Sequence, residues 1–456
     1  MNQNQNSGLG RRGFLGLATL GITGAAVSAC GGGPSTSADA GRRTDAAIDY
    51  SKVQPASSIT FWTSNPGHSE AVTRQIVDAF HATQPGIEVN LVTAGSNYEE
   101  VAQKYQTARA GGDLPDLVIL SDVWWFSFYM NDAIIPLDAL IKQVGIQGSD
   151  YVDSLWSDYT FNGAQWAVPW SRSTPIFYYN KDHWKKAGLP DRAPHSWAEF
   201  ARWAPRLQSA RAGAKHAFQL PALVDYAGWT LQNNLWGWGG GWSKQGTFDM
   251  TASSAQSVAA LQFLQDAVYR DKWAGVASQD STVDLGAGAV SSTIASTGSL
   301  VGVLEAAKGR FDVGAGFLPG GPREMKPVCP TGGAGLAISK SSSPEAQLAA
   351  AMFLQFLTNP DNTLTFAAAT GYMPVRKSAD TSSLVKKSPL SKIAIDQLAV
   401  TRSQDYARVF LPGADHEMAN TAANILTSHA AVSSELTTLQ GKLQDIYETK
   451  VKPNVP

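Results

Sequence analysis

The chain of 456 residues lacks most of the features that mark enzymes and disulfide-rich proteins. Its two cysteines, Cys30 and Cys329, are too few for a disulfide framework. The seven histidines are scattered, without the spacing of a metal site. No Gly-x-Ser-x-Gly elbow, dinucleotide-binding glycine motif or Gly-Lys-Ser/Thr phosphate loop occurs. We therefore predict a protein that is not an enzyme and that uses no metal or other cofactor.

Charged side chains are also scarce, at 16% of residues, and the formal net charge is only −2. Because no basic run or patch is present, nucleic acid is not expected as a partner. Glycine and tryptophan are abundant instead, with 42 and 14 copies. The length is sufficient for two or three domains, since a single core of this size would be unusual.

The first thirty residues have the form of an export signal. Arg11-Arg12 precede a short apolar run that ends in Val-Ser-Ala-Cys at Cys30, and the run is too short for a typical membrane-spanning helix. The arginine pair is similar to a twin-arginine signal, although general export signals carry such pairs too. The final four residues resemble a bacterial lipobox, which implies that Cys30 becomes a lipid-modified N-terminus; the alternative is a buried apolar segment with a chance cysteine. Residues 31–57 are rich in small residues and are predicted to be a flexible tether.

Residues 58–170 have the pattern of a β-α-β-α-β unit. Strand character is found at 59–62, 87–91 and 117–120. Such a unit forms a parallel sheet with right-handed crossovers, and ligands bind beyond the carboxyl ends of its strands. Tyr98 and Asp122 follow two of those ends, so both are predicted to face one cleft. The alternatives are that Tyr98 lies on the surface and that Asp122 caps a helix.

The aromatic and β-branched stretch 166–181, interrupted by two prolines, predicts extended chain that crosses from one lobe to another past a cleft. We assign 58–170 together with about 300–345 to the first lobe. The second lobe is expected to comprise 171–299 together with about 346–456.

Several residues of the later chain have the character of ligand contacts. Tyr226 and Trp229 stand at helical spacing within an aromatic, glycine-rich stretch, and together they suit a polyol or a quaternary ammonium. Any single tryptophan, however, is more often part of the core. Ser296 opens a run of small residues that is either an anion site or an ordinary helix start. Gly333 lies in a glycine-rich turn that a ligand can approach closely.

Arg408 is flanked by Ala407 and Val409, so partial burial is expected. A partly buried guanidinium needs an anion beside it. That anion is either a ligand or an internal carboxylate, for which Asp405 and Asp415 are the candidates.

The order of several motifs resembles the family-1 extracellular solute-binding proteins of ABC importers. The shared motifs are Val-Pro…Tyr-Tyr-Asn-Lys at 168–181, Gly-Leu-Pro at 188–190 and Ser-Trp-x-Glu-Phe at 196–200. The resemblance implies an α/β protein with the two-lobe periplasmic-binding-protein (flytrap) fold and a ligand cleft between the lobes. It also implies delivery of the ligand to the transmembrane permease subunits.

More narrowly, the chain resembles the Ugp-type members, which bind glycerol-3-phosphate and glycerophosphodiesters, with the actinobacterial glycerophosphocholine-binding members most similar. The matching segments are 97–101, 122–126, 172–175, 296–299, 371–372 and 405–410.

Carried over to this sequence, the resemblance implies that Arg408, Tyr372 and the backbone amides near Gly333 and Ser296 hold a phosphate. Asp122, with Tyr98 and Ser173, would bind glycerol hydroxyls. Trp229 would line the head-group side, where Tyr226 stands at a position that varies among relatives.

Together these features predict an exported, monomeric, lipid-anchored binding protein on the outer face of the cytoplasmic membrane. Its expected ligands are glycerophosphodiesters, with glycerophosphocholine ahead of glycerol-3-phosphate. The closest alternative is a sugar-binding lipoprotein of the same fold that takes a di- or oligosaccharide. A secreted phosphodiester hydrolase and a structural envelope lipoprotein are the remaining alternatives.

Overall fold

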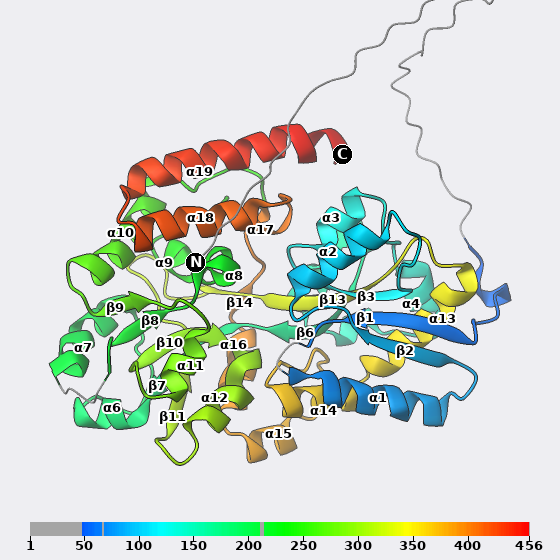
Figure 1. Cartoon of the computed structure of the whole chain (residues 1–456), viewed down its shortest axis with the longest axis horizontal. Helices are drawn as coiled ribbons and strands as arrows, with labels where there is room; N and C mark the ends of the chain where they lie inside the picture. Colours follow the sequence, from blue (N-terminus) through cyan, green and yellow to red (C-terminus); the bar gives the residue numbers. More distant parts are fainter. Residues whose placement is uncertain (1–47, 66–67, 210–213, 456) are drawn as a thin grey trace, which may run out of the picture. The chain divides into compact units, whose positions relative to one another are not determined.

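The computed structural model describes residues 48–65, 68–209 and 214–455 (Figure 1). The predicted signal sequence, Cys30 and most of the predicted tether lie outside the described residues. None of the helices in the described part of the chain has the length and apolarity of a membrane span.

The first lobe is built on a five-stranded sheet in the order β2-β1-β3-β13-β6. Its strands are β1 (Ser58–Thr63), β2 (Glu88–Thr93), β3 (Leu117–Ser121), β6 (Val168–Ser173) and β13 (Gly332–Ile338). Strands β1, β2 and β3 are parallel, which confirms the predicted β-α-β-α-β unit. Every residue of β3 is buried, as expected for the apolar strand at the middle of this sheet.

Helices cover both faces of this sheet, with α2 on one side and α1 and α14 on the other (Figure 1). The helices and short strands of this lobe are α1 (Glu70–Thr83), α2 (Tyr98–Ala108), α3 (Trp125–Met130), α4 (Asp138–Val144), α5 (Asp153–Ser157), β4 (Thr160–Phe161), β5 (Ala164–Gln165), α13 (Pro344–Leu357) and α14 (Pro360–Thr370).

The second lobe is built on a five-stranded sheet in the order β11-β7-β10-β8-β9. Its strands are β7 (Pro175–Asn180), β8 (Phe218–Leu220), β9 (Ala274–Val276), β10 (Ser292–Ser296) and β11 (Val313–Gly316). The helices associated with it are α6 (Lys181–Lys186), α7 (Trp197–Ser209), α8 (Leu223–Thr230), α9 (Gln232–Gly237), α10 (Ala255–Tyr269), α11 (Ser281–Gly286), α12 (Leu300–Ala307), α18 (Ala414–Thr427) and α19 (Val432–Ile446). Between α14 and α18 the chain forms α15 (Ser382–Lys387), α16 (Ser391–Leu398), β14 (Thr401–Arg402) and α17 (Tyr406–Val409).

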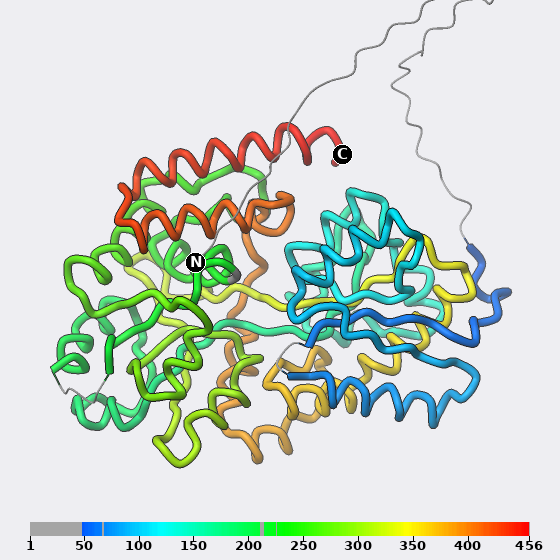
Figure 2. The backbone as a smooth tube through the Cα atoms, in the orientation of Figure 1, coloured from blue at the N-terminus to red at the C-terminus, as the bar shows by residue number. Residues whose placement is uncertain are grey.

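Two neighbouring chain segments cross between the lobes. Thr174 alone separates β6 in the first sheet from β7 in the second, which confirms the predicted crossing. Thr331 alone separates β13 from the short strand β12 (Cys329–Pro330), and β13 is paired antiparallel with β6 (Figure 2). Residues at these two crossings therefore lie at the boundary of both lobes.

The lobe membership of the returning chain differs from the expected boundaries. Strand β11 pairs with β7 in the second sheet, although 300–345 was assigned to the first lobe. Helix α13 packs on the first lobe instead of the second, because Phe353 inserts between Phe61 and Phe80 with ring centroids 5.8 and 5.1 Å away. Apolar periodicity predicts such a helix but does not say which sheet its apolar face will cover.

The predicted tether is also shorter than 31–57, because residues 48–57 belong to the folded unit. The Tyr50 side chain is buried and its hydroxyl donates a 2.5 Å hydrogen bond to Gln347 Oε1 on α13. The Ala56 amide donates to the Glu345 carbonyl at 2.9 Å. The buried ring and this backbone hydrogen bond together fix a segment whose composition otherwise indicates a linker.

Candidate ligand-binding site

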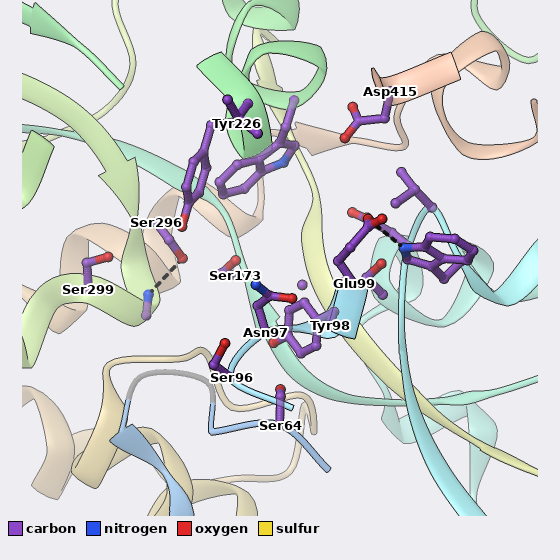
Figure 3. Close-up of a pocket in the computed structure, with 18 of the residues that line it drawn as sticks. Ser64, Ser96, Asn97, Tyr98, Glu99, Ser173, Tyr226, Ser296, Ser299 and Asp415 are labelled. Carbon is purple, nitrogen blue, oxygen red and sulfur yellow. Dashed lines mark hydrogen bonds between the residues drawn. The ribbon is translucent and has the colours of Figure 1, made fainter. Parts of the chain in front are cut away.

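A cavity of about 930 Å³ lies between the two sheets and is lined by elements of both lobes (Figure 3). All nine residues predicted as ligand contacts line it: Tyr98, Asp122, Ser173, Tyr226, Trp229, Ser296, Gly333, Tyr372 and Arg408. Figure 3 shows Tyr226 and Ser296 on the opposite side of the cavity from Tyr98 and Glu99. The structure thus brings the nine together, and their contact with a ligand stays a prediction.

Tyr98 enters the cavity from the first turn of α2. Asn97 begins this helix by accepting a 2.9 Å hydrogen bond from the Glu100 amide. The Tyr98 hydroxyl lies 3.0 Å from Ser171 Oγ and 3.2 Å from the Tyr372 hydroxyl, so it faces the cleft and not the outer surface. Burial raises the pKa of both tyrosines, which keeps their hydroxyl groups protonated at neutral pH and able to donate.

Asp122 follows β3 and is buried, with 5% of its surface exposed. Its Oδ2 accepts a short hydrogen bond from Gln404 Nε2, and its Oδ1 lies 3.4 Å from Arg408 Nη1. Helix α3 begins instead after Trp124, without a side-chain cap. The alternative in which Asp122 caps this helix is therefore wrong, because its carboxylate turns across the cavity toward α17.

Arg408 lies on the short helix α17 and is 5% exposed. Its Nε donates to Asp415 Oδ1 at 2.8 Å, and its Nη1 donates to Gln404 Oε1. The internal salt bridge considered as an alternative is thus present with Asp415. Nη2 has no hydrogen-bond partner among the described residues, so it is available to an anionic ligand.

Asp405, the other candidate partner of Arg408, is bound by other side chains and backbone groups instead. Its carboxylate accepts hydrogen bonds from Trp236 Nε1 at 3.0 Å and from the Trp242 amide at 2.8 Å. Arg402, which stacks on the Trp236 ring at 3.6 Å, lies 3.5 Å from the same carboxylate. Burial raises the pKa of Asp405 to about 6.

Tyr226 and Trp229 share one face of α8, as their spacing predicts, with ring centroids 6.2 Å apart. The Trp229 indole donates to the Thr331 carbonyl at 2.8 Å, and its ring packs on Gly332. Of the later tryptophans, Trp236 lies in α9 and Trp242 lies beyond the end of that helix, and both are buried in the core, as single tryptophans usually are.

The opposite wall is formed by the residues that follow β10. Ser296 caps this turn by accepting a 3.0 Å hydrogen bond from the Gly298 amide (Figure 3). Gly298 lies under the Tyr372 ring, where a Cβ atom would come within 2.7 Å of the ring carbons. Ser296 is therefore a helix start that also borders the cavity, and a role in binding an anion stays a prediction.

Gly333 lies in β13 and not in a turn, with a φ of +99°. A Cβ atom at this position would collide with the Ser171 carbonyl, so only glycine fits. Its own carbonyl accepts a 3.1 Å hydrogen bond from the Asp122 amide, which links the two predicted binding residues.

Two further residues of the site were not among the predicted contacts. Gln404 bridges Asp122 and Arg408 through the two ends of its amide, and Glu99 Oε2 accepts a 3.3 Å hydrogen bond from Trp124 Nε1. Gln404 precedes Arg408 by four residues, but such spacing is too common to identify a site.

Negative charge dominates the wall of the cavity. Five carboxylates line it: Glu99, Asp122, Asp280, Glu305 and Asp415. Arg408 is the one arginine or lysine among the described lining residues. In the described part of the chain, no group of three or more His, Cys, Asp or Glu side chains could hold a metal ion. The cavity therefore suits a ligand in which an anionic group lies beside a cationic one.

The chain is similar in sequence to known solute-binding proteins. The family model for bacterial extracellular solute-binding proteins matches residues 75–393. The sn-glycerol-3-phosphate-binding periplasmic protein UgpB of Escherichia coli K12 is 29% identical over 342 residues, which are 72% of this chain and 76% of that protein.

Solved structures are also similar. UgpB from Mycobacterium tuberculosis, in complex with glycerophosphocholine, has 44% identity and a TM-score of 0.82, over 86% of this chain and 99% of that chain. Maltose-bound MalE3 of T. maritima has a TM-score of 0.75 over 85% of this chain and 99% of that chain. At 24% identity, the latter likeness shows the fold alone.

Proposed function

This chain belongs to the family of bacterial extracellular solute-binding proteins, and we propose that it captures glycerophosphodiesters for an ABC importer. The family membership gives it the two-lobe solute-binding fold and a role outside the cytoplasm. Glycerophosphocholine is the proposed ligand and glycerol-3-phosphate a weaker one.

The observation that carries the proposal is the convergence of complementary groups from both lobes on one cavity. The free Nη2 of Arg408 and the Tyr372 hydroxyl are donors for phosphate oxygens. Asp122 is an acceptor for glycerol hydroxyls, with Tyr98 and Ser173 beside it.

The head-group end is proposed to lie against Tyr226 and Trp229, whose ring faces attract a quaternary ammonium. The excess of carboxylates over Arg408 supports the same choice, since a zwitterion brings its own positive charge into a negative cavity. A phosphomonoester, which carries about two negative charges at neutral pH, lacks that compensation.

Capture is proposed to proceed by closure of the lobes around the ligand. A ligand stabilises the closed form only if it binds that form more tightly than the open one. Contacts drawn from Tyr98 and Asp122 on one lobe and from Trp229 and Ser296 on the other provide this difference.

We further propose that Cys30 is lipid-modified and holds the protein at the outer face of the cytoplasmic membrane, next to the permease subunits it serves. The protein is proposed to act as a monomer. A Cys30→Ala variant should then leave the membrane fraction while keeping its affinity for ligand. Retention of the variant in washed membranes would exclude the anchor.

The deciding experiment is calorimetric binding to the chain that begins at Cys30, with glycerophosphocholine, glycerol-3-phosphate, maltose and trehalose as ligands. Glycerophosphocholine should bind and raise the unfolding free energy by about 3 kcal/mol at a hundredfold excess over the dissociation constant. Binding of a disaccharide alone would keep the importer role and replace the ligand class. Release of choline or glycerol-3-phosphate from the ligand would contradict a pure binding function.

A further inference from the structure

Asp415 stands in the cavity wall without an assigned role. It belongs to the first turn of α18, and its Oδ1 lies 2.8 Å from Arg408 Nε. Its side chain is 24% exposed, so the carboxylate borders both the cavity and the protein interior.

Helix α8 encloses this ion pair from behind. A Cβ atom on Gly228 would collide with Asp415 Oδ1 and would lie 3.1 Å from Arg408 Nε. The Gly228 carbonyl is fixed by a 2.8 Å hydrogen bond from Trp242 Nε1. Tyr226 and Trp229 belong to the same helix, so α8 both carries the two aromatic residues proposed for the head group and packs against the Arg408–Asp415 pair.

The pairing controls the direction of the guanidinium and the net charge of the group around it. Asp415 holds Nε, Gln404 and Asp122 hold Nη1, and Nη2 alone is left for a ligand. Since two carboxylates, Asp122 and Asp415, flank one guanidinium, the local charge is negative before any ligand binds. A phosphate that reaches Nη2 is therefore attracted by Arg408 and repelled by both carboxylates.

We propose that Asp415 is a specificity-determining residue, which acts through Arg408 to select phosphodiesters with a cationic head group over phosphomonoesters. The repulsion scales with the charge of the ligand, so it is about twice as large for a dianionic monoester as for a monoanionic diester. The choline of a zwitterionic diester offsets it further. This inference rests on the proposed function of the cavity.

The test compares the dissociation constants of glycerol-3-phosphate and glycerophosphocholine for the chain that begins at Cys30 and for its Asp415→Asn variant. Removal of one charge within a few ångströms of the phosphate should reduce the ratio of the two constants by about tenfold or more. Asp415→Glu, which keeps the charge, should keep the wild-type ratio even if both affinities fall. A role in folding alone would not move the ratio.

Glu417→Gln is the matched control, since Glu417 is on the same helix but pairs with Lys442 at 2.7 Å and does not line the cavity. This change should leave the ratio unaltered. If Asp415→Asn does not fold, Asp415→Ser removes the same charge with a smaller side chain, and the ratio decides in the same way.

This inference would be overturned if the wild type binds glycerophosphocholine and Asp415→Asn has the same ratio of the two dissociation constants as the wild type. That outcome would leave the proposed function intact. A wild-type chain that binds neither ligand would overturn both. A ratio that falls equally in Glu417→Gln would also refute the inference, because the effect would then be one of general charge.

Discussion

Substitution of Gly228 by alanine tests the central packing of the site. A methyl group at this position collides with Asp415 Oδ1, and Arg408 Nε is only 3.1 Å from it. Asp415 or helix α8 must therefore move by more than an ångström. Either shift breaks the 2.8 Å Arg408–Asp415 contact and displaces the helix that carries Trp229.

The magnitude follows from three opposing effects. Alanine in place of glycine within a helix contributes about 1 kcal/mol of stability. Overpacking costs about 1–3 kcal/mol, and disruption of a buried ion pair costs about 3–5 kcal/mol at the upper limit. Because Asp415 is 24% exposed and partly solvated, we take the lower end of both ranges, and after the helix gain of about 1 kcal/mol we expect a net loss of about 3 kcal/mol.

Urea denaturation and calorimetric titration with glycerophosphocholine measure the two consequences. The midpoint should fall, and the affinity should decrease by at least about tenfold, since Arg408 loses its orientation. Gly441→Ala is the control, because Gly441 is also within a helix, α19, with nothing within 4 Å of the added methyl group. That variant should gain about 0.5–1 kcal/mol. A Gly228→Ala protein with the stability and affinity of the wild type would refute the reasoning.

Three further predictions concern buried charges. Arg408→Ala should abolish phosphodiester binding and lower the unfolding free energy in urea by about 3 kcal/mol, because Asp122 and Asp415 lose their buried counter-ion; retained affinity would exclude the guanidinium from the site. Asp122→Asn should weaken calorimetric binding of glycerophosphocholine about tenfold or more with little loss of stability, and a loss of stability alone would indicate a structural role. The pKa of Asp405 is raised from 3.8 to about 6, so the folded state binds the proton more tightly and this group's contribution to stability falls as pH rises from about 4 to 6. In urea denaturation between pH 4.5 and 7, this carboxylate should lower the free energy of unfolding of the wild type by up to about 3 kcal/mol, and Asp405→Asn should not show that decrease. Identical pH profiles for the two proteins would contradict the buried carboxylate.

The sequence contained enough information for the regular parts of the fold. Alternating and continuous apolar strands specify the parallel β2-β1-β3 unit, and two prolines in an extended aromatic run mark the crossing at Thr174. The carboxyl ends of parallel strands meet at one edge, so topology alone brings Tyr98 and Asp122 to a common cavity.

Long-range partners could not be predicted in the same way. Gln404 donates a hydrogen bond to Asp122 although the two are 282 residues apart in the sequence, and apolar periodicity does not predict such a contact. Helical spacing predicted that Tyr226 and Trp229 share one face of a helix, but it did not indicate which of the later tryptophans, such as Trp236 and Trp242, would be buried in the core. The resemblance to a known family identified residues around the cavity, but it did not indicate that Arg408 is already paired with two carboxylates.

The single-residue crossings at Thr174 and Thr331 have an evolutionary consequence. Each crossing is held on both sides by strands, so few backbone dihedral angles are free there. The side chains that line the cavity come mostly from helix starts and strand ends, not from the two threonines. Residues of the cavity wall can therefore be exchanged while both crossings stay unchanged, which fits the occurrence of a similar fold in a maltose-bound protein at 24% identity.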